Sequence, residues 1–385
     1  MAKQKSYLFV LSEKGGGDHP PVVALALGLR DRGHRVHMLC DQSSANSLGG
    51  TGLETSLFPA SLDTRGQISD WIRKLRREGL DTSAQLPNPM TEWALPLFKF
   101  SQNIAKDFNP DLIVSSLFGI GLADLISIAI DLPWCFVNPS FYFGEGNQLD
   151  WSDDWYGPYI PLLAKDCFLP ITQKADIVLH ATDPEFDPPA KQIPKNQHVV
   201  GFLLWEPTLA MPKGIGVKGD PWALITLSSV AQDNEVVLAK SALEALATYP
   251  VRSLLTQPDA DFREQLGELP QNAQIEGFVP HTAILKDSAV VVSHGGHGIV
   301  SKAISYGVPM VLVPWDRDQP GVAERAKNMG VAKVVPRAEA NEASIRAAVS
   351  DIFSDETYAN LAGNHSKRIL ALDSIGRACT LVEGF

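Results

Sequence analysis

The stretch Ser293-His294-Gly295-Gly296-His297-Gly298 decides the fold class, because two adjacent glycines in it join an apolar strand to a helix. Residues 289–292 before the turn are apolar, as in a strand that is covered on both faces. Helical periodicity begins directly after the turn. The amides at a helix start lack partners and carry the positive end of the helix dipole. The stretch therefore predicts an α/β domain that binds an anion, and a diphosphate suits it.

Strands and helices alternate on both sides of this stretch. In the second half of the chain, apolar runs predict strands at 223–227, 253–255, 289–293, 310–313 and 332–335. In the first half, they predict strands at 7–11, 36–40, 112–114, 134–137 and 177–180. Segments with helical periodicity separate the strands, which favours parallel sheets. We therefore expect an α/β protein with two doubly wound, Rossmann-like domains that face a central cleft.

Proline and glycine clusters between Phe202 and Pro221 divide the two halves. The predicted N-terminal domain covers residues 1–205, a linker covers 206–220, and the C-terminal domain covers 221–365. A C-terminal helix is expected at 366–385, and packing back on the N-terminal domain is one arrangement open to it. A chain of 385 residues suits two such domains better than one.

The overall charge argues against nucleic acid as a partner. The formal net charge is −11, whereas phosphate backbones are bound through clustered Lys and Arg. The four cysteines lie far apart, which favours a reducing compartment. The N-terminus lacks the apolar core of a signal peptide, and the apolar stretch 112–130 is interrupted by Asp124 and two glycines. We expect a soluble cytoplasmic protein.

Two further motifs follow the glycine turn. Tyr306-Gly307-Val308-Pro309 leads into the next strand, and Asp318-Gln319 comes after that strand. In this order and spacing, the motifs resemble the C-terminal signature of the inverting nucleotide-sugar glycosyltransferases, which have the two-domain GT-B fold. The resemblance implies that the N-terminal domain binds an acceptor and that the C-terminal domain binds a nucleotide-sugar donor.

The resemblance also implies roles for individual donor-site residues. The residues assigned to the diphosphate are His294, Gly295, Gly296 and Gly298, with Ser228 and Ser229 in a second turn. Asp318 and Gln319 are assigned to the sugar hydroxyls, since a carboxylate beside an amide can accept and donate hydrogen bonds. His281 is assigned to the nucleobase or ribose, and His297 is either a donor ligand or a packing residue. Ile299 departs from the family, because most members have Thr or Ser there.

Asp18 is the predicted general base. Aligned on Gly33-His34, the family's Gly-His-x-x-Pro motif becomes Gly17-Asp18-His19-Pro20-Pro21, which places Asp where most members have the catalytic His. This version resembles the branch of sterol glucosyltransferases and glycopeptide-antibiotic glycosyltransferases. His19 is the rival base, and a helix N-cap is the structural alternative for Asp18. A dinucleotide fingerprint would need glycine at Pro20, which argues against a dehydrogenase.

The orienting partner of the usual histidine base is replaced in this chain. Family members carry an aspartate after the fourth strand, where this sequence has Ser116. A histidine base would lose its partner there, whereas a lone carboxylate needs none. The sequence therefore favours Asp18 as the base.

Aromatic residues crowd two irregular stretches of the N-terminal domain, either as an acceptor lining or as ordinary core. Those assigned to the acceptor are Trp93, Phe141, Tyr142, Phe143 and Trp151. An aromatic lining suits a flat apolar acceptor such as a sterol, polyketide or flavonoid. Peripheral membrane contact is expected only if the acceptor is a lipid.

The expected reaction is inverting transfer of a hexose from a UDP- or dTDP-sugar to an acceptor hydroxyl, without a metal or other cofactor. Asp316-Arg317-Asp318 is similar to the paired carboxylates that hold a divalent ion in the other glycosyltransferase fold, but a helix start can stabilise the diphosphate alone. One alternative is a nucleotide-sugar 2-epimerase of the same fold, which would release free sugar. The other is an inactive relative that binds a nucleotide-sugar or a lipid, which Ile299 and Ser116 favour.

Overall fold

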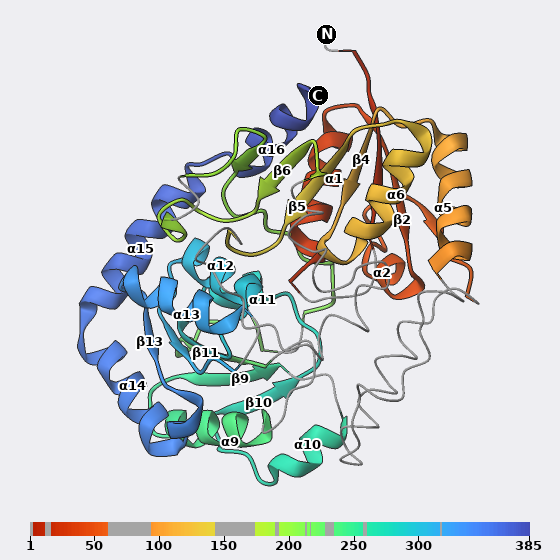
Figure 1. The fold of residues 1–385 in the computed structure, drawn as a ribbon. Helices are drawn as coiled ribbons and strands as arrows, with labels where there is room; N and C mark the ends of the chain where they lie inside the picture. The colour runs from red at the N-terminus through yellow and green to blue at the C-terminus, as the bar shows by residue number, and fades with distance from the viewer. Residues whose placement is uncertain are drawn as a thin grey trace. The chain divides into compact units, whose positions relative to one another are not determined.

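The structure is a computed structural model, and it describes residues 3–11, 17–60, 94–142, 174–188, 192–211, 214–215, 217–227, 235–256, 260–315 and 318–385. The chain forms two compact units (Figure 1). The first unit contains Met1–Thr182, Pro189–Trp205 and Ser374–Phe385, and the second contains Asp183–Pro188 and Glu206–Asp373. Each unit is therefore assembled from separate pieces of the sequence.

The first unit is built on a seven-stranded sheet in the order β3-β2-β1-β4-β5-β6-β7. Its strands are β1 (Ser6–Val10), β2 (Arg35–Cys40), β3 (Glu54–Leu57), β4 (Leu112–Ser115), β5 (Trp134–Asn138), β6 (Ile177–His180) and β7 (Gln197–Val199). All neighbouring strands are parallel. From β1 the strands are added first towards one edge of the sheet, through β2 and β3, and then from β4 towards the other edge. The carboxyl ends of β1 and β4 are therefore the switch point, where doubly wound sheets bind ligands.

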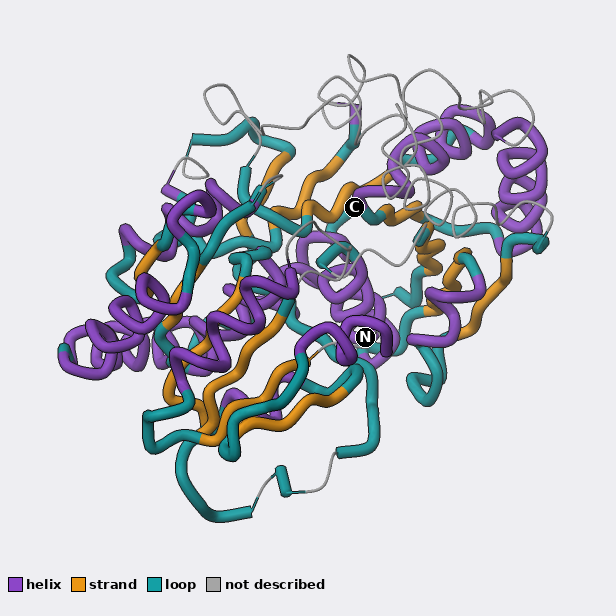
Figure 2. The backbone as a smooth tube through the Cα atoms, turned by 90° about the horizontal axis from the view of Figure 1, so that it is seen from below, coloured by secondary structure: helices purple, strands orange, loops and turns teal. Residues whose placement is uncertain are grey.

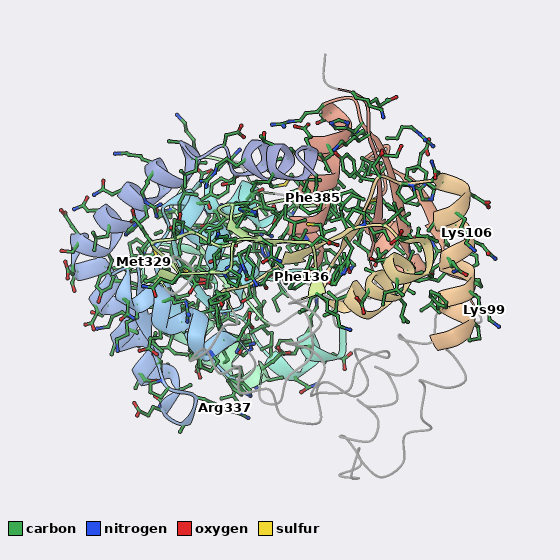
Figure 3. The ribbon with its side chains drawn as sticks, turned by 45° about the horizontal axis from the view of Figure 1, so that its top comes forward. Lys99, Lys106, Phe136, Met329, Arg337 and Phe385 are labelled. Atoms are coloured by element: carbon green, nitrogen blue, oxygen red, sulfur yellow. The ribbon has the colours of Figure 1, made fainter. Side chains whose placement is uncertain are left out.

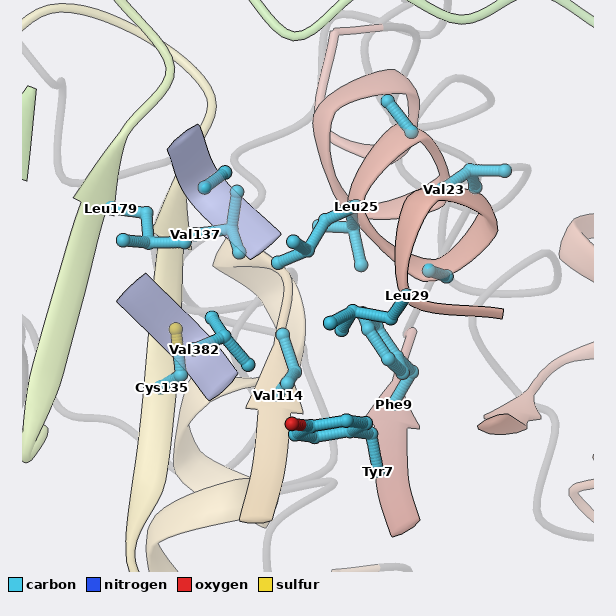
Figure 4. Packing of buried hydrophobic residues seen from close by; sticks show 14 of the residues in the cluster. Tyr7, Phe9, Val23, Leu25, Leu29, Val114, Cys135, Val137, Leu179 and Val382 are labelled. Atoms are coloured by element: carbon cyan, nitrogen blue, oxygen red, sulfur yellow. The ribbon is translucent and has the colours of Figure 1, made fainter. Parts of the chain in front are cut away.

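Helices cover both faces of this sheet. They are α1 (His19–Asp31), α2 (Gln42–Ser47), α5 (Ala94–Phe108), the 3₁₀ turn η1 (Leu117–Gly119), α6 (Ile120–Ile130) and α16 (Ser374–Glu383). Tyr7 and Phe9 of β1 share a buried cluster with Leu25 of α1 and Val382 of α16 (Figure 4). The alternate strand residues are also buried, and α6 packs against β1, β4 and β5. Lys99 and Lys106 point outward from α5 (Figure 3).

The second unit is built on a six-stranded parallel sheet in the order β10-β9-β8-β11-β12-β13. Its strands are β8 (Trp222–Thr226), β9 (Arg252–Thr256), β10 (Ala273–Glu276), β11 (Ser288–Ser293), β12 (Met310–Leu312) and β13 (Ala332–Val334). Its helices are α9 (Glu235–Leu246), α10 (Ala260–Leu266), α11 (His281–Leu285), α12 (His297–Tyr306), α13 (Gln319–Asn328), η4 (Arg337–Glu339), α14 (Glu342–Ser354) and α15 (Glu356–Leu370). In each unit the strands run side by side and helices flank them (Figure 2). The switch point of the second sheet lies between β8 and β11.

The predicted fold class, two doubly wound parallel-sheet domains, is confirmed. Each predicted strand begins and ends within one residue of an observed strand. The strands β3, β7 and β10 were not predicted from the sequence. The segment expected to be one helix at 366–385 contains the end of α15 in the second unit and the whole of α16 in the first. Residues from Glu206 onward, which begin the predicted linker, belong to the second unit.

The helix α16 packs against α1 at a glycine. A Cβ atom on Gly28 would lie 2.6 Å from Cγ2 of Ile375 and 2.8 Å from Sγ of Cys379. Glu383 at the end of α16 accepts a 2.7 Å hydrogen bond from Arg32, and its other oxygen lies 2.9 Å from Nε2 of His34. Close backbone approach and these polar contacts therefore fix the last helix on the first unit.

Candidate functional site

Two glycines shape the turn that follows β11. Gly295 has a φ of +81°, a conformation that favours glycine, and its N–H donates to Oγ of Ser293 at 3.1 Å. Gly296 occupies the N-cap of α12, where no side chain caps the helix. The turn lies at the switch point of the second sheet. Its amides are thus well placed to bind an anion.

The His294 side chain is 2% exposed and is fixed through one of its two nitrogens. A carbonyl oxygen only accepts, so Nδ1 donates to the Val313 carbonyl, at 3.4 Å. Nε2 lies 3.5 Å from the buried Glu235 carboxylate at the start of α9, within ion-pair distance. In the part of the chain that the structure describes, Nε2 makes no hydrogen bond. Glu235 was not predicted as a site residue, because nothing in the sequence places it beside His294.

Trp315 and Gln319 meet at the start of α13. The Trp315 main-chain N–H donates to Oε1 of Gln319 at 2.9 Å, and Gln319 is 4% exposed. Asp318 occupies the N-cap of α13, but its side chain makes no capping hydrogen bond. Asp316 and Arg317 lie outside the described residues, so the paired-carboxylate motif stays a sequence observation.

A partly buried carboxylate holds the start of α11, where His281 is the first residue. The N–H groups of His281 and Thr282 donate to the two oxygens of Glu206, at 3.0 Å and 2.9 Å. Lys302 of α12 donates to the same carboxylate at 2.7 Å. Burial alone would raise the pKa of Glu206, but the Lys302 charge and these hydrogen bonds outweigh burial and lower it. Glu206 thus joins the His281 loop to α12, a role hidden from the sequence because the residue lies in the predicted linker.

His281 is a neutral side chain at physiological pH. Burial, followed by the nearby Lys302 charge, lowers the pKa of His281 to about 4. Its Nε2 lies 3.2 Å from Oγ1 of Thr256. A neutral imidazole in this loop suits contact with an uncharged base or ribose better than with a phosphate.

Asp18 lies at the switch point of the first sheet. It is 3% exposed and occupies the N-cap position of α1, but its side chain does not cap that helix, contrary to the structural alternative drawn from the sequence. Instead, its Oδ1 accepts a 2.7 Å hydrogen bond from the Leu117 N–H, in the turn after β4. The carboxylate therefore lies beside the residue that follows Ser116, where the family pattern has its orienting aspartate. The Ser116 hydroxyl itself makes no hydrogen bond in the described part of the chain.

Gly119 allows this turn to approach β1. A Cβ atom on Gly119 would lie 2.7 Å from the Val10 carbonyl oxygen, closer than any side chain tolerates. The Ser116 N–H donates to the same carbonyl oxygen at 3.2 Å. The hydrogen bond between Leu117 and Asp18 thus depends on a glycine that the sequence did not single out.

His19 contacts a different element from Asp18. It is 5% exposed, and its Nε2 lies 3.4 Å from Oγ of Ser44 in α2. The Ser44 hydroxyl donates to Asp41 at 2.7 Å, and Asp41 also caps α2 through the Ser44 N–H. These contacts tie the start of α1 to β2 and α2.

Only two of the predicted acceptor residues are among those described. Phe141 is 3% exposed, which is the burial of a core residue, and Tyr142 is half-buried. The Asn138 amide donates to the Phe141 carbonyl at 2.9 Å and contacts Nδ1 of His180 at 3.0 Å. The Tyr142 ring meets the His180 ring edge to face. Residues outside the described ranges include the predicted site residues Trp93, Phe143, Trp151, Ser228 and Ser229.

His297 packs against an aromatic ring in the second unit. It is 6% exposed as the first residue of α12, and its ring meets Phe186 edge to face at 5.7 Å. The segment that carries Phe186 is held by Asp187, which pairs with Arg325 of α13 at 3.0 Å. Phe186 is therefore the packing partner that the second interpretation of His297 requires.

Within the described ranges, no group of three or more His, Cys, Asp and Glu side chains is arranged to hold a metal ion. A search of the same ranges finds no helix long and apolar enough to cross a membrane.

Comparisons with known proteins point to one enzyme family. A sequence model described as the C-terminal domain of erythromycin biosynthesis protein CIII-like proteins matches residues 229–372. The 4'-demethylrebeccamycin synthase of Lentzea aerocolonigenes is 28% identical over 58% of this chain and 53% of its own length. The NDP-glycosyltransferase YjiC of Bacillus subtilis is 23% identical over 99% of this chain and 98% of its own length.

Solved structures share the fold over the whole chain. The glycosyltransferase of kitacinnamycin superposes with a TM-score of 0.74 at 22% identity and covers 100% of this chain and 99% of its own. The glycosyltransferase VinC, solved in complex with dTDP, superposes with a TM-score of 0.69 at 18% identity and covers 99% of this chain and 100% of its own.

Proposed function

Since this chain is a glycosyltransferase of the UDP-glycosyltransferase-like family with the GT-B fold, we propose that it transfers a hexose from a UDP- or dTDP-sugar to a hydroxyl of a small apolar acceptor, with inversion. The observation that carries the proposal is the turn after β11. There, buried His294, left-handed Gly295 and the uncapped start of α12 lie together at the switch point of the second sheet. This arrangement suits the diphosphate of a nucleotide-sugar.

Asp18 is the proposed general base. It takes the proton of the acceptor hydroxyl while the oxygen forms a bond to the anomeric carbon. The bond from that carbon to the β-phosphate oxygen breaks, and its electron pair leaves with the nucleoside diphosphate. The Leu117 N–H orients the carboxylate at 2.7 Å, and the helix starts at α1 and η1 favour its negative charge.

The leaving group gains negative charge in the transition state. His294 and the amides from Gly296 into α12 stabilise that charge, which is the place where fixed dipoles accelerate a transfer most. Asp318 and Gln319 bind the sugar hydroxyls, and His281 lies beside the base or ribose. These contacts supply the electrostatic stabilisation without a metal ion.

The acceptor is proposed to be a natural product or another flat apolar molecule. One similar protein is named for rebeccamycin synthesis, and one solved structure with the same fold is named for kitacinnamycin. Tyr142, held edge-on against His180, is the described aromatic residue that best suits an acceptor surface.

The test is a transfer assay with UDP- and dTDP-hexoses and a panel of polyketide, flavonoid and sterol acceptors. We expect a glycoside whose anomeric configuration, read by NMR, is opposite to that of the donor, with activity retained in EDTA. Release of free sugar in place of a glycoside would indicate the 2-epimerase instead. Binding of the nucleotide-sugar without any turnover of the panel would favour the inactive relative, and a requirement for Mg²⁺ would contradict metal independence.

A further inference from the structure

Trp315 connects two residues assigned to different parts of the donor. Its ring meets the His294 ring edge to face, with centroids 5.0 Å apart. Its main-chain N–H donates to Oε1 of Gln319 at 2.9 Å. His294 is assigned to the diphosphate and Gln319 to the sugar. Trp315 therefore contacts residues on both sides of the bond that the reaction breaks.

The Trp315 indole carries a buried donor without a partner. Its Nε1 has no hydrogen bond in the part of the chain that the structure describes. A buried N–H that stays unpaired costs free energy, so its presence in a native fold calls for an explanation. The Arg337 guanidinium lies over the ring, 4.2 Å from its centroid, and holds the ring in place.

A second tryptophan in the same unit shows why location matters. Among the described residues, the buried Nε1 of Trp222 also has no hydrogen-bond partner, and Arg252 lies over its ring at the same 4.2 Å. Trp222, however, begins β8 at the amino end of the sheet, whereas Trp315 follows β12 at the carboxyl end. Doubly wound sheets bind ligands at the carboxyl end. Of this pair, only Trp315 is placed to meet a ligand.

We propose that the Trp315 indole N–H donates a hydrogen bond to the β-phosphate of the donor, which is the phosphate that bears the sugar. This inference rests on the proposed function and adds a specificity residue to it. The β-phosphate joins the diphosphate to the sugar, so it is the donor group that must lie between His294 and Gln319.

The test compares Trp315→Phe with a variant that carries benzothienylalanine at position 315, in which sulfur replaces the indole N–H and the shape is kept. Calorimetric titration measures Kd for UDP and dTDP and for UMP and dTMP, which lack the β-phosphate. We expect Kd for the diphosphates to rise about 10-fold, as for a lost hydrogen bond to a charged group. Kd for the monophosphates should stay within about twofold of wild type, since their phosphate is not the one contacted. Trp222→Phe is the matched control, and its Kd values should equal those of wild type.

The outcomes separate this inference from the function on which it rests. Unchanged diphosphate affinity in the benzothienylalanine variant overturns the inference, and so does an equal loss for monophosphates and diphosphates, which would indicate only a displaced loop. If His294→Ala weakens diphosphate binding while both Trp315 variants bind normally, the inference fails and the donor site stands. If His294→Ala also binds diphosphates normally, the donor assignment itself is wrong.

Discussion

Asp18 and His19 are adjacent in the sequence but contact different parts of the first unit. The Asp18 carboxylate accepts from the Leu117 N–H after β4, whereas His19 lies near Ser44 in α2. Two neighbouring helix starts surround the carboxylate, and a hydroxyl that already donates to Asp41 lies beside the imidazole. We therefore keep Asp18 as the proposed base and propose a positioning role for His19.

The first prediction follows from this difference. Asp18→Asn retains an oxygen that can accept from Leu117 but loses the basic oxygen, so kcat should fall roughly 10²–10⁴-fold. His19→Gln should reduce kcat less, and both variants should bind the nucleoside diphosphate normally. Steady-state kinetics with calorimetric titration measures both effects. Near-normal turnover in Asp18→Asn together with an inactive His19→Gln would assign the base to histidine.

His180 provides the pH prediction. Burial lowers the pKa of His180 to about 4, while Asn138 and Gln197 satisfy its two ring nitrogens. The unfolded chain binds this proton below about pH 6.5, but the folded unit binds it only near its own lower pKa. The free energy of unfolding therefore falls as the pH drops from about 6.5 towards 4, by up to about 3 kcal/mol for this one group.

His180→Gln removes the titration, since glutamine takes up no proton. Urea unfolding at pH 7 and pH 5 should show a stability loss that is about 2 kcal/mol smaller in the variant than in wild type. His281 titrates in both proteins, so its contribution cancels. Equal losses in the two proteins would mean that folding does not lower the pKa of His180.

At the scale of elements, two helical glycines make a matched pair. Gly28 in α1 faces Ile375 and Cys379 so closely that a Cβ atom would lie under 3.0 Å from both, whereas a Cβ atom on Gly363 in α15 would meet nothing within 4 Å. Gly28→Ala should destabilise the protein by about 1–3 kcal/mol through overpacking. Gly363→Ala should stabilise it by about 0.5–1 kcal/mol through helix propensity. Denaturant unfolding measures both changes, and stabilisation by both would show that α16 moves aside easily.

The sequence predicted elements well where an apolar run lies between turn residues. The strands that hold the two switch points, β1, β4, β8 and β11, were all expected. Three of the four edge strands, β3, β7 and β10, were missed because they bury fewer residues: every residue of β10 is only partly buried. Breaks between helices were missed as well, since the short gap between α15 and α16 carries no proline or glycine signal.

The candidate site was predictable where a motif is local and hidden where partners are distant in sequence. The turn at Gly295 and the pair Asp318-Gln319 are read directly from adjacent residues. Glu206, Glu235 and the Leu117 N–H are not, because only the folded sheet brings them to their partners. A main-chain donor such as Leu117 has no side-chain signature at all.

At the scale of the whole molecule, ligand binding should stabilise one unit selectively. A nucleoside diphosphate at about 100 times its Kd adds about 2.7 kcal/mol to the unit that binds it. Hydrogen exchange should therefore slow in peptides from 206–373 and 183–188, which belong to the second unit. Peptides from α16, although next in sequence to α15, should exchange at their unliganded rate. Protection that appears in α16 and not in α15 would contradict the donor assignment.

The last helix, α16, belongs to the first unit, and this limits how two such enzymes can be joined into a hybrid. A hybrid that joins this chain to a relative after residue 205 inherits its final helix from the wrong parent. The last helix of the relative must then pack on α1, where Gly28 leaves no room for a bulkier contact. A crossover that also restores residues 374–385 keeps both sheets with their own helices. Exchange of donor specificity between relatives therefore needs two crossovers. With a single crossover, the residues that face position 28 come from the other parent and need not fit Gly28.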